Sequence, residues 1–156
     1  MREQEKISTA LIVLNLALIW GNSLLPGSAS GAMSGGVMQF VMELLRIPAE
    51  HAELLHHFVR KAAHFTEFAC LGALLCWRFQ LTGERGWKLA ALPVLCGMAA
   101  ALTDETIQMF TPDRGPSLTD VWIDTAGTAA GMTAVLCGYD YFTRIKHKSE
   151  MLEETT

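Results

Sequence analysis

The sequence has few charged residues and lacks the patterns of several common protein classes. Charged side chains make up 18% of its 156 residues, whereas soluble domains usually contain roughly one quarter. The net charge of −4 is small, and basic residues are not interleaved with aromatic residues, so no nucleic-acid partner is expected. The chain is long enough for one domain. It shows no internal repeat of the kind found in many transporters.

Cysteine is present, but without the spacing of a zinc site or a redox pair. Cys70, Cys76, Cys96 and Cys137 all lie within apolar runs, and no CxxC pair occurs. No serine or cysteine lies in a recognised nucleophile motif. The cysteines are therefore expected to be small hydrophobic residues in a membrane core.

Long apolar runs dominate the sequence, in which 51% of residues are apolar. Runs of about 20 mainly apolar residues predict about four transmembrane helices, over residues 7–25, 62–81, 87–110 and 118–142. These helices would form one all-α membrane bundle over residues 1–145, followed by a disordered cytoplasmic tail over residues 146–156. The first run could be a signal peptide, but its length and its terminal Trp20 favour a retained helix.

The segment between the first two runs is predicted to hold a turn and a short interfacial helix. Residues 27–36 are rich in glycine and serine, which predicts a turn. Apolar residues then recur at helical spacing, which is typical of an amphipathic helix lying in the membrane interface; they are Val37, Phe40, Val41, Leu44 and Leu45. Pro48 suits the first turn of a further helix, and Glu50 is placed favourably for its dipole.

The distribution of basic residues favours a cytoplasmic N-terminus and a cytoplasmic C-terminus. With that orientation, most of the 12 lysines and arginines lie on the inner side, as the positive-inside rule requires. The inner residues are Arg2, Lys6, Arg78, Arg85, Lys88, Arg144, Lys146 and Lys148. The outer residues are Arg46, Arg60, Lys61 and Arg114.

The same topology brings ionisable residues from three separate spans to one membrane face, the outer one. Helical spacing places His57, Arg60, His64 and Glu67 on one stripe. Asp120 and Asp124 share a second stripe, which continues through Gly127 and Gly131. Such a GxxxG pattern lets another helix approach closely, so the acids are expected to face the bundle. The full set at this level is Arg60, Lys61, His64, Glu67, Asp104, Glu105, Gln108, Arg114, Asp120 and Asp124.

These residues allow three interpretations, because a charge within a membrane span costs a few kcal/mol and is usually paired or functional. In the first, they pair with one another and only hold the helices together. In the second, Arg60, Lys61 and Arg114 bind an anionic head group, since arginine forks onto phosphate or carboxylate. In the third, His64 with Glu67 or Asp104 transfers protons. Alternatively, Asp120 and Asp124 hold a divalent cation with Glu105. The other histidines, His51, His56, His57 and His147, are expected to be solvent or interface residues.

Three ordered motifs resemble the VanZ-like family of bacterial membrane proteins. They are residues 60–68 (RKAAHFTEF) followed by Leu71 and Gly72, residues 103–110 (TDETIQMF) followed by Pro112 and Arg114, and residues 120–127 (DVWIDTAG) followed by Gly131. Asn22, Ser23 and Pro26 also fit, so the resemblance extends over about residues 7–142.

The resemblance implies a cell-envelope role in a bacterial plasma membrane, and it does not supply a reaction. The family is named for a protein associated with low-level resistance to teicoplanin, a lipid-bearing glycopeptide antibiotic. The preferred hypothesis is a polar pocket that binds an anionic amphiphile: a membrane lipid phosphate, a lipid-linked cell-wall intermediate or a lipoglycopeptide. In it, Arg60, Lys61, Gln108 and Arg114 would bind the ligand, and the catalytic candidates are His64, Glu67, Asp104, Glu105, Asp120 and Asp124. The alternatives are a hydrolase or transferase acting on a lipid head group, with a divalent cation possible, and a structural scaffold.

Overall fold

The computed structural model describes residues 2–46 and 48–153, and all of the regular structure in these residues is helical. The predicted all-α fold is therefore confirmed. The elements in chain order are α1 (Arg2–Ser23), α2 (Gly27–Leu45), the short 3-10 helix η1 (Ala49–His51), α3 (Ala52–Leu81), α4 (Gly86–Gln108) and α5 (Leu118–Glu153).

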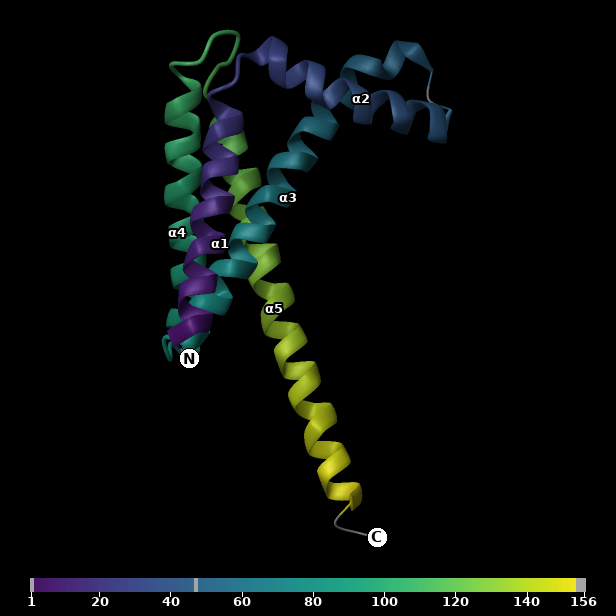
Figure 1. Ribbon diagram of the computed structural model, residues 1–156. Helices are drawn as coiled ribbons and strands as arrows, with labels where there is room; N and C mark the ends of the chain where they lie inside the picture. Colours follow the sequence, from purple (N-terminus) through teal and green to yellow (C-terminus); the bar gives the residue numbers. More distant parts are fainter. Residues whose placement is uncertain (1, 47, 154–156) are drawn as a thin grey trace.

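Helix α3 is the centre of the arrangement, because it packs against each of the other α-helices. In Figure 1, α1 and α4 run side by side, and α3 and α5 cross next to them. Helix α2 and the first turns of α3 form an arm that projects from one end of this bundle. The second half of α5 extends beyond the opposite end.

Glycine allows α3 and α5 to approach each other closely. A Cβ atom added at Gly127 would collide with the backbone carbonyl of Phe65, and one added at Gly131 would collide with that of Ala69. From the other side, Gly72 of α3 lies directly against the backbone of Thr128. The predicted role of the GxxxG pattern in close packing within one chain is therefore confirmed.

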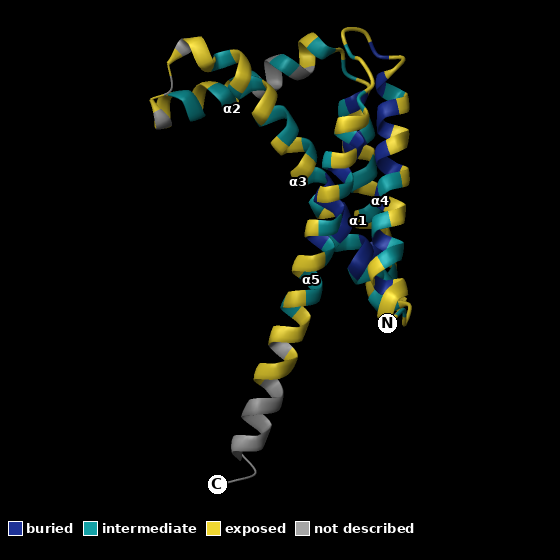
Figure 2. Ribbon diagram, turned by 180° about the vertical axis from the view of Figure 1, so that it is seen from behind, coloured by how far each residue is buried: buried dark blue, intermediate teal, exposed yellow. Residues whose placement is uncertain are grey.

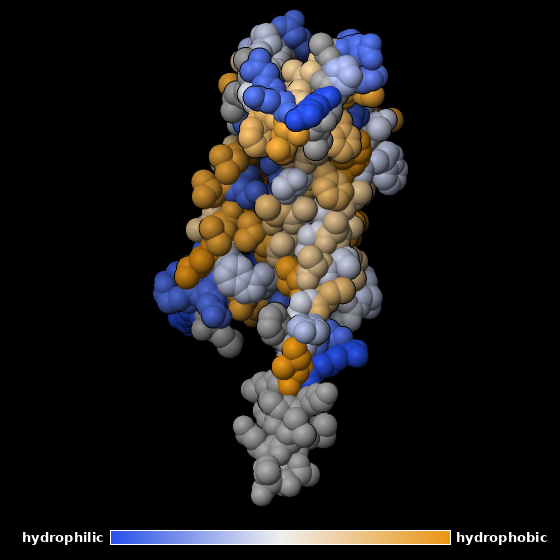
Figure 3. Space-filling model, turned by 90° about the vertical axis from the view of Figure 1, so that its right-hand side faces the viewer, coloured by the Kyte–Doolittle hydropathy of each residue, from blue (hydrophilic) through white to orange (hydrophobic). Residues whose placement is uncertain are grey.

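Polar residues fill much of the interior, while large apolar side chains lie on the outside. Asp104 is 0% exposed and Asp124 is 1% exposed, whereas Leu14 is 56% exposed and Leu18 is 57% exposed. Figure 2 shows buried residues concentrated where the helices meet. Figure 3 shows apolar residues over the middle of the molecule, between more polar ends. A cluster of buried apolar residues that includes Ile19, Phe68 and Leu71 accompanies the polar groups, and the many large apolar side chains on the outside are typical of helices that face lipid.

Two helices, α1 and α4, are long and apolar enough to cross a membrane. Ionisable residues within the apolar runs of α3 and α5 lower the mean hydropathy of these two helices; examples are Glu67 and Arg78 in α3, and Asp120 and Asp124 in α5. By length and composition these two helices could each cross a membrane, and the predicted bundle of about four spans stays a prediction.

Helix α2 is longer than the sequence predicted. The expected glycine- and serine-rich turn over residues 27–36 is wrong, because α2 already begins at Gly27 after Pro26. Tertiary contact offsets the low helix propensity of glycine: α2 packs on α3, and Gly31 O lies 3.4 Å from Nε2 of His56. Phe40 and Leu44 are exposed, as on the apolar face of an interfacial helix. The side chains of Val37 and Leu45 lie outside the described residues.

The end of α5 also differs from the sequence expectation. The helix continues to Glu153, through most of the segment for which a disordered tail was predicted. Asp140 and Arg144 form an ion pair of 2.9 Å at the (i, i+4) spacing that supports a helix. The side chains of residues 146–153, and all of residues 154–156, lie outside the part of the chain that the structure describes.

Candidate functional site

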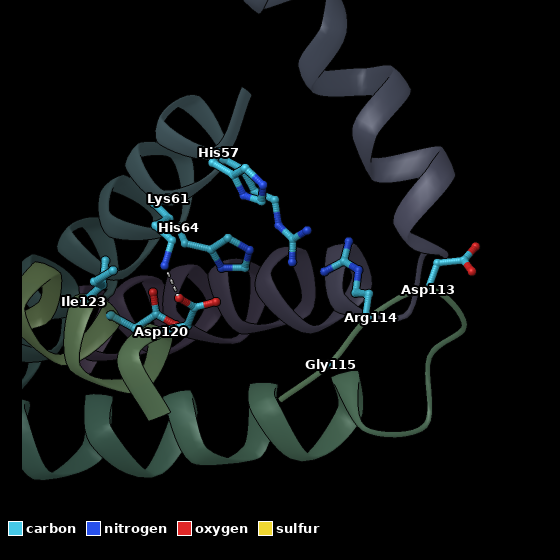
Figure 4. A pocket seen from close by; sticks show the side chains of 10 residues that line it. His57, Lys61, His64, Asp113, Arg114, Gly115, Asp120 and Ile123 are labelled. Atoms are coloured by element: carbon cyan, nitrogen blue, oxygen red, sulfur yellow. Dashed lines mark hydrogen bonds and ion pairs between the residues drawn. The ribbon is translucent and has the colours of Figure 1, made fainter. Parts of the chain in front are cut away.

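A cavity of about 260 Å³ lies between α3, the start of α5 and the loop that precedes α5. Figure 4 shows the side chains of His57, His64 and Arg114 directed into a common space, and that of Asp113 directed away from it. The complete lining is His57, Arg60, Lys61, His64, Asp113, Arg114, Gly115, Asp120, Ile123 and Asp124.

Arg60 and Arg114 bring guanidinium groups to this cavity from α3 and from the loop. Nη2 of Arg114 donates a hydrogen bond of 3.1 Å to the backbone oxygen of Asn22. Nε and Nη1 of Arg114 are buried and have no hydrogen-bond partner among the described residues. Burial, and next the charge of Arg60, lower the pKa of the Arg114 guanidinium. Two guanidinium groups that lie close enough for one to affect the other, with free donors on Arg114, form a site that suits an anion.

Lys61 differs from the two arginines, because its charge is already paired. Its Nζ lies 2.7 Å from Oδ1 of Asp120, and the two side chains are 43% and 27% exposed. The pair joins α3 to the first turn of α5, where Asp120 also suits the helix dipole. Lys61 is therefore less available to a ligand than Arg60 or Arg114.

Replacing Lys61 with methionine is expected to change the free energy of unfolding by less than about 1 kcal/mol, because partly exposed ion pairs contribute little. Thermal unfolding of the wild type and of Lys61→Met in the same detergent measures the difference. A loss of about 3 kcal/mol or more would show that this pair contributes as a buried one does.

Two lining residues, His64 and Asp124, meet the buried Asp104 behind the cavity wall. Ligand atoms of His64, Asp104 and Asp124 all lie within 4.8 Å of one another. Both carboxylate oxygens of Asp124 are buried and have no hydrogen-bond partner in the described part of the chain. Among the described residues, these three side chains bring their ligand atoms close enough together to bind one metal ion. The alternative that Asp120 and Asp124 hold a cation with Glu105 stays a prediction; Asp120 pairs with Lys61 and Glu105 accepts a hydrogen bond from Ser117.

Asp104 is held in place by α1 and by its own helix. Its Oδ1 accepts a hydrogen bond of 2.5 Å from Oγ of Ser23, and its Oδ2 accepts one of 2.8 Å from Nε2 of Gln108. Gln108 also lies 3.4 Å from Oγ of Ser23. The network is fully buried, so it fixes one orientation of the Asp104 carboxylate.

Glu67 and Glu105 lie behind the cavity, and each accepts a hydrogen bond from another segment of the chain. Oε1 of Glu67 accepts a hydrogen bond of 2.8 Å from the Asn22 amide. Oε2 of Glu105 accepts one of 2.6 Å from the backbone N–H of Ser117, immediately before α5. Both carboxylates thus anchor parts of the chain that shape the cavity wall.

Six of the ten predicted site residues line the cavity, and the remaining four lie directly behind it. The lining residues are Arg60, Lys61, His64, Arg114, Asp120 and Asp124, and the others are Glu67, Asp104, Glu105 and Gln108. His57 also lines the cavity, although it was interpreted as an interface residue; its place on the stripe of Arg60 and His64 was the available signal. His147 has a side chain outside the described residues.

The end of α1 is the part of the site that the sequence reasoning missed. Asn22 and Ser23 bind Glu67, Asp104 and Arg114 through the hydrogen bonds given above. Thr111 adds a hydrogen bond of 2.9 Å to the backbone oxygen of Ser23, and the N–H of Gly27 donates to Pro112 O at 3.1 Å. Hydrogen bonds therefore hold the end of α1 and the connection that follows it against the loop that carries Arg114. The motif resemblance of Asn22 and Ser23 was the signal that could have placed them here.

Comparison with known proteins identifies one family. The sequence profile of a family described as VanZ/LLP1 matches residues 8–139. Searches of curated proteins and of solved structures found no match to this chain. The matched range contains every residue of the cavity lining and of the buried network behind it.

Proposed function

This chain belongs to the VanZ/LLP1 family, which is associated with glycopeptide resistance, and from this premise we propose that its cavity binds an anionic amphiphile of the bacterial cell envelope. The candidates are a membrane lipid phosphate, a lipid-linked cell-wall intermediate and a lipoglycopeptide. They share a negatively charged head group attached to long apolar chains.

We propose further that α1, α3, α4 and α5 cross the plasma membrane, with the N- and C-termini in the cytoplasm. The apolar exterior of these helices supports insertion, and the distribution of lysine and arginine supports this orientation. The cavity would then open at the outer face, where lipid-linked precursors and glycopeptides are encountered. Helix α2 would lie along this face, because its exposed Phe40 and Leu44 suit the membrane interface.

The binding proposal rests on two arginines at the cavity, Arg60 and Arg114, neither of which forms an ion pair with a described carboxylate. Arg114 has two buried nitrogens without a partner, and Arg60 makes no hydrogen bond or ion pair with another described residue. An arginine guanidinium binds phosphate or carboxylate through parallel hydrogen bonds, so an anionic head group would satisfy donors that the protein leaves free. A scaffold has no use for such donors, because an unpaired buried group destabilises the fold.

The surroundings of the cavity support a ligand that has apolar chains. A cavity of about 260 Å³ is smaller than typical sites for drug-sized ligands, which measure roughly 300–1,000 Å³. It therefore suits a head group alone. Phe58, Phe65 and Trp122 are exposed and adjoin cavity residues in the sequence. These side chains would contact the ligand's chains within the membrane.

Replacing Arg60 with glutamine is expected to abolish retention of one anionic lipid class, because it removes a cavity charge that has no hydrogen-bond or ion-pair partner among the described residues. The wild type and Arg60→Gln would be purified in mild detergent, and their bound lipids identified by native mass spectrometry. Phosphate and lipoglycopeptide candidates differ in mass, so the wild-type spectrum also identifies the ligand class.

The matched control is Arg85→Gln, which removes one arginine at the opposite end of α4. It is expected to retain lipid as the wild type does. Equal retention by Arg60→Gln and the wild type, with equal melting temperatures, would show that the polar residues form a scaffold.

A second candidate function, hydrolysis or transfer at a lipid head group, is favoured by the position of His64 beside Asp104 and Asp124. A positioned imidazole can accept a proton from an attacking water or hydroxyl group. Turnover of the retained lipid that stops in His64→Ala, without loss of binding, would support this candidate.

A further inference from the structure

We infer that His64, Asp104 and Asp124, at the inner side of the cavity, form a binding site for a divalent metal ion, and that this ion coordinates a phosphate of the head group. The metal's role toward the head group rests on the proposed function, whereas the three protein ligands stand on the geometry of the cluster. Each ligand comes from a different helix: His64 from α3, Asp104 from α4 and Asp124 from α5.

The spacing of the ligand atoms fits a single ion after a small side-chain adjustment. The atoms lie within 4.8 Å of one another. A tetrahedral ion bound at roughly 2.0–2.2 Å by nitrogen and oxygen ligands places these atoms about 3.3–3.6 Å apart, so the most distant of them must move inward by roughly 1 Å. Rotation of the unpartnered Asp124 carboxylate can supply this difference, because no hydrogen bond restrains it.

The burial of Asp124 is an independent indication of a ligand. Its side chain is only 1% exposed, and neither oxygen has a hydrogen-bond partner among the described residues. A buried carboxylate without a partner is strongly unfavourable, and such groups are found paired or bound to a metal. No lysine or arginine in the described part of the chain forms an ion pair with Asp124, and Lys61 pairs with Asp120 instead.

Asp104 has the environment that is usual for a metal ligand. Ser23 and Gln108 donate hydrogen bonds to its two oxygens, and each oxygen keeps a further lone pair. Such outer partners orient ligating carboxylates and are a regular part of metal sites. Ser23 and Gln108 are therefore positioning residues in this proposal.

The donor set favours Zn²⁺ or Mn²⁺ over Mg²⁺ and Ca²⁺. One imidazole and two carboxylates suit a first-row transition metal, whereas Mg²⁺ and Ca²⁺ prefer sites made only of oxygen. Three protein ligands would leave a coordination position open, and His64 and Asp124 line the same cavity as Arg60 and Arg114. A phosphate oxygen could occupy this position while the guanidinium groups bind the other oxygens. The preferred ligand class within the proposed function is therefore a phosphate-bearing lipid.

The test measures metal binding by Zn²⁺ and Mn²⁺ titration of the full chain in detergent, after treatment with a chelator and dialysis. We expect the wild type to bind an equimolar amount of one of these ions and to show a raised melting temperature in its presence, because a ligand that binds only the folded state stabilises it. Asp124→Asn keeps the shape of the side chain, and we expect its metal binding to fall at least tenfold. The matched control is Asp140→Asn, the same substitution further along α5 and outside the cavity, which should bind metal as the wild type does.

The outcomes separate this inference from the proposed function. Wild-type protein without saturable metal binding, or Asp124→Asn that binds as tightly as the wild type, overturns the metal site even if lipid is retained. If the protein binds metal but retains no anionic lipid, the proposed function is overturned and the metal site is still supported. If Asp124→Asn does not fold, His64→Gln serves as the second variant, and the melting temperature of the wild type with and without metal decides.

Discussion

Gly131→Val is expected to destabilise the bundle by about 3 kcal/mol or more, as severe overpacking does. The Cβ atom alone would collide with the carbonyl of Ala69 in α3, and this neighbour is backbone, which cannot rotate away. The two helices would have to separate. Separation would also disturb the neighbouring contacts of Gly127 with Phe65 and of Gly72 with Thr128.

Thermal unfolding in detergent, followed by circular dichroism, measures this loss. Gly138→Val provides the matched control, because it lies two turns further along α5 and a Cβ atom there has no neighbour within 4 Å. The control should differ little from the wild type. Similar melting temperatures for both valine variants would show that α3 and α5 do not rely on this close contact.

Asp104→Ala is expected to lower the free energy of unfolding by roughly 2 to 5 kcal/mol, because it removes the carboxylate that accepts hydrogen bonds from two buried donors. These donors are Oγ of Ser23 and Nε2 of Gln108. Both residues are almost completely buried, with exposures of 0% and 1%. The substitution would also loosen α1 from α4, which Ser23 and Asp104 connect.

Unfolding should be measured with a chelator present, so that loss of a bound metal does not contribute. Asp124→Asn is the informative comparison under these conditions, because neither oxygen of Asp124 accepts a hydrogen bond from a described residue. We expect Asp124→Asn to be as stable as the wild type or more stable, since it removes a buried charge. If the two variants unfold at the same temperature, the hydrogen bonds to Asp104 contribute no measurable stability.

Helical spacing in the sequence grouped several of the residues that line the cavity. The stripe of Arg60 and His64 faces the stripe of Asp120 and Asp124 across the cavity, and the glycines below the acids pack on α3, as expected. These features depend on the 3.6-residue period and on the apolar lengths of the helices, and both are local properties of the sequence.

The choice of partner within the site could not be read from the same patterns. Asp120 and Asp124 are four residues apart and equivalent in helical phase, yet Asp120 binds Lys61 and Asp124 faces His64. That difference depends on the crossing of α3 and α5. The contribution of Asn22 and Ser23 likewise depends on how α1 packs against α4, and the full length of α2 depends on its contact with α3. All three are tertiary effects that override local propensity.

The polar, glycine-rich interior has a consequence for how the assembly responds to temperature. A large heat capacity of unfolding arises when apolar surface is transferred from protein to water. Separation of α3 from α5 within a bilayer would expose glycine, threonine and carboxylate groups to lipid, and would hydrate little leucine or phenylalanine. The enthalpy of that separation should therefore vary little with temperature. Cooling would not weaken this contact in the way that it weakens the core of a soluble domain.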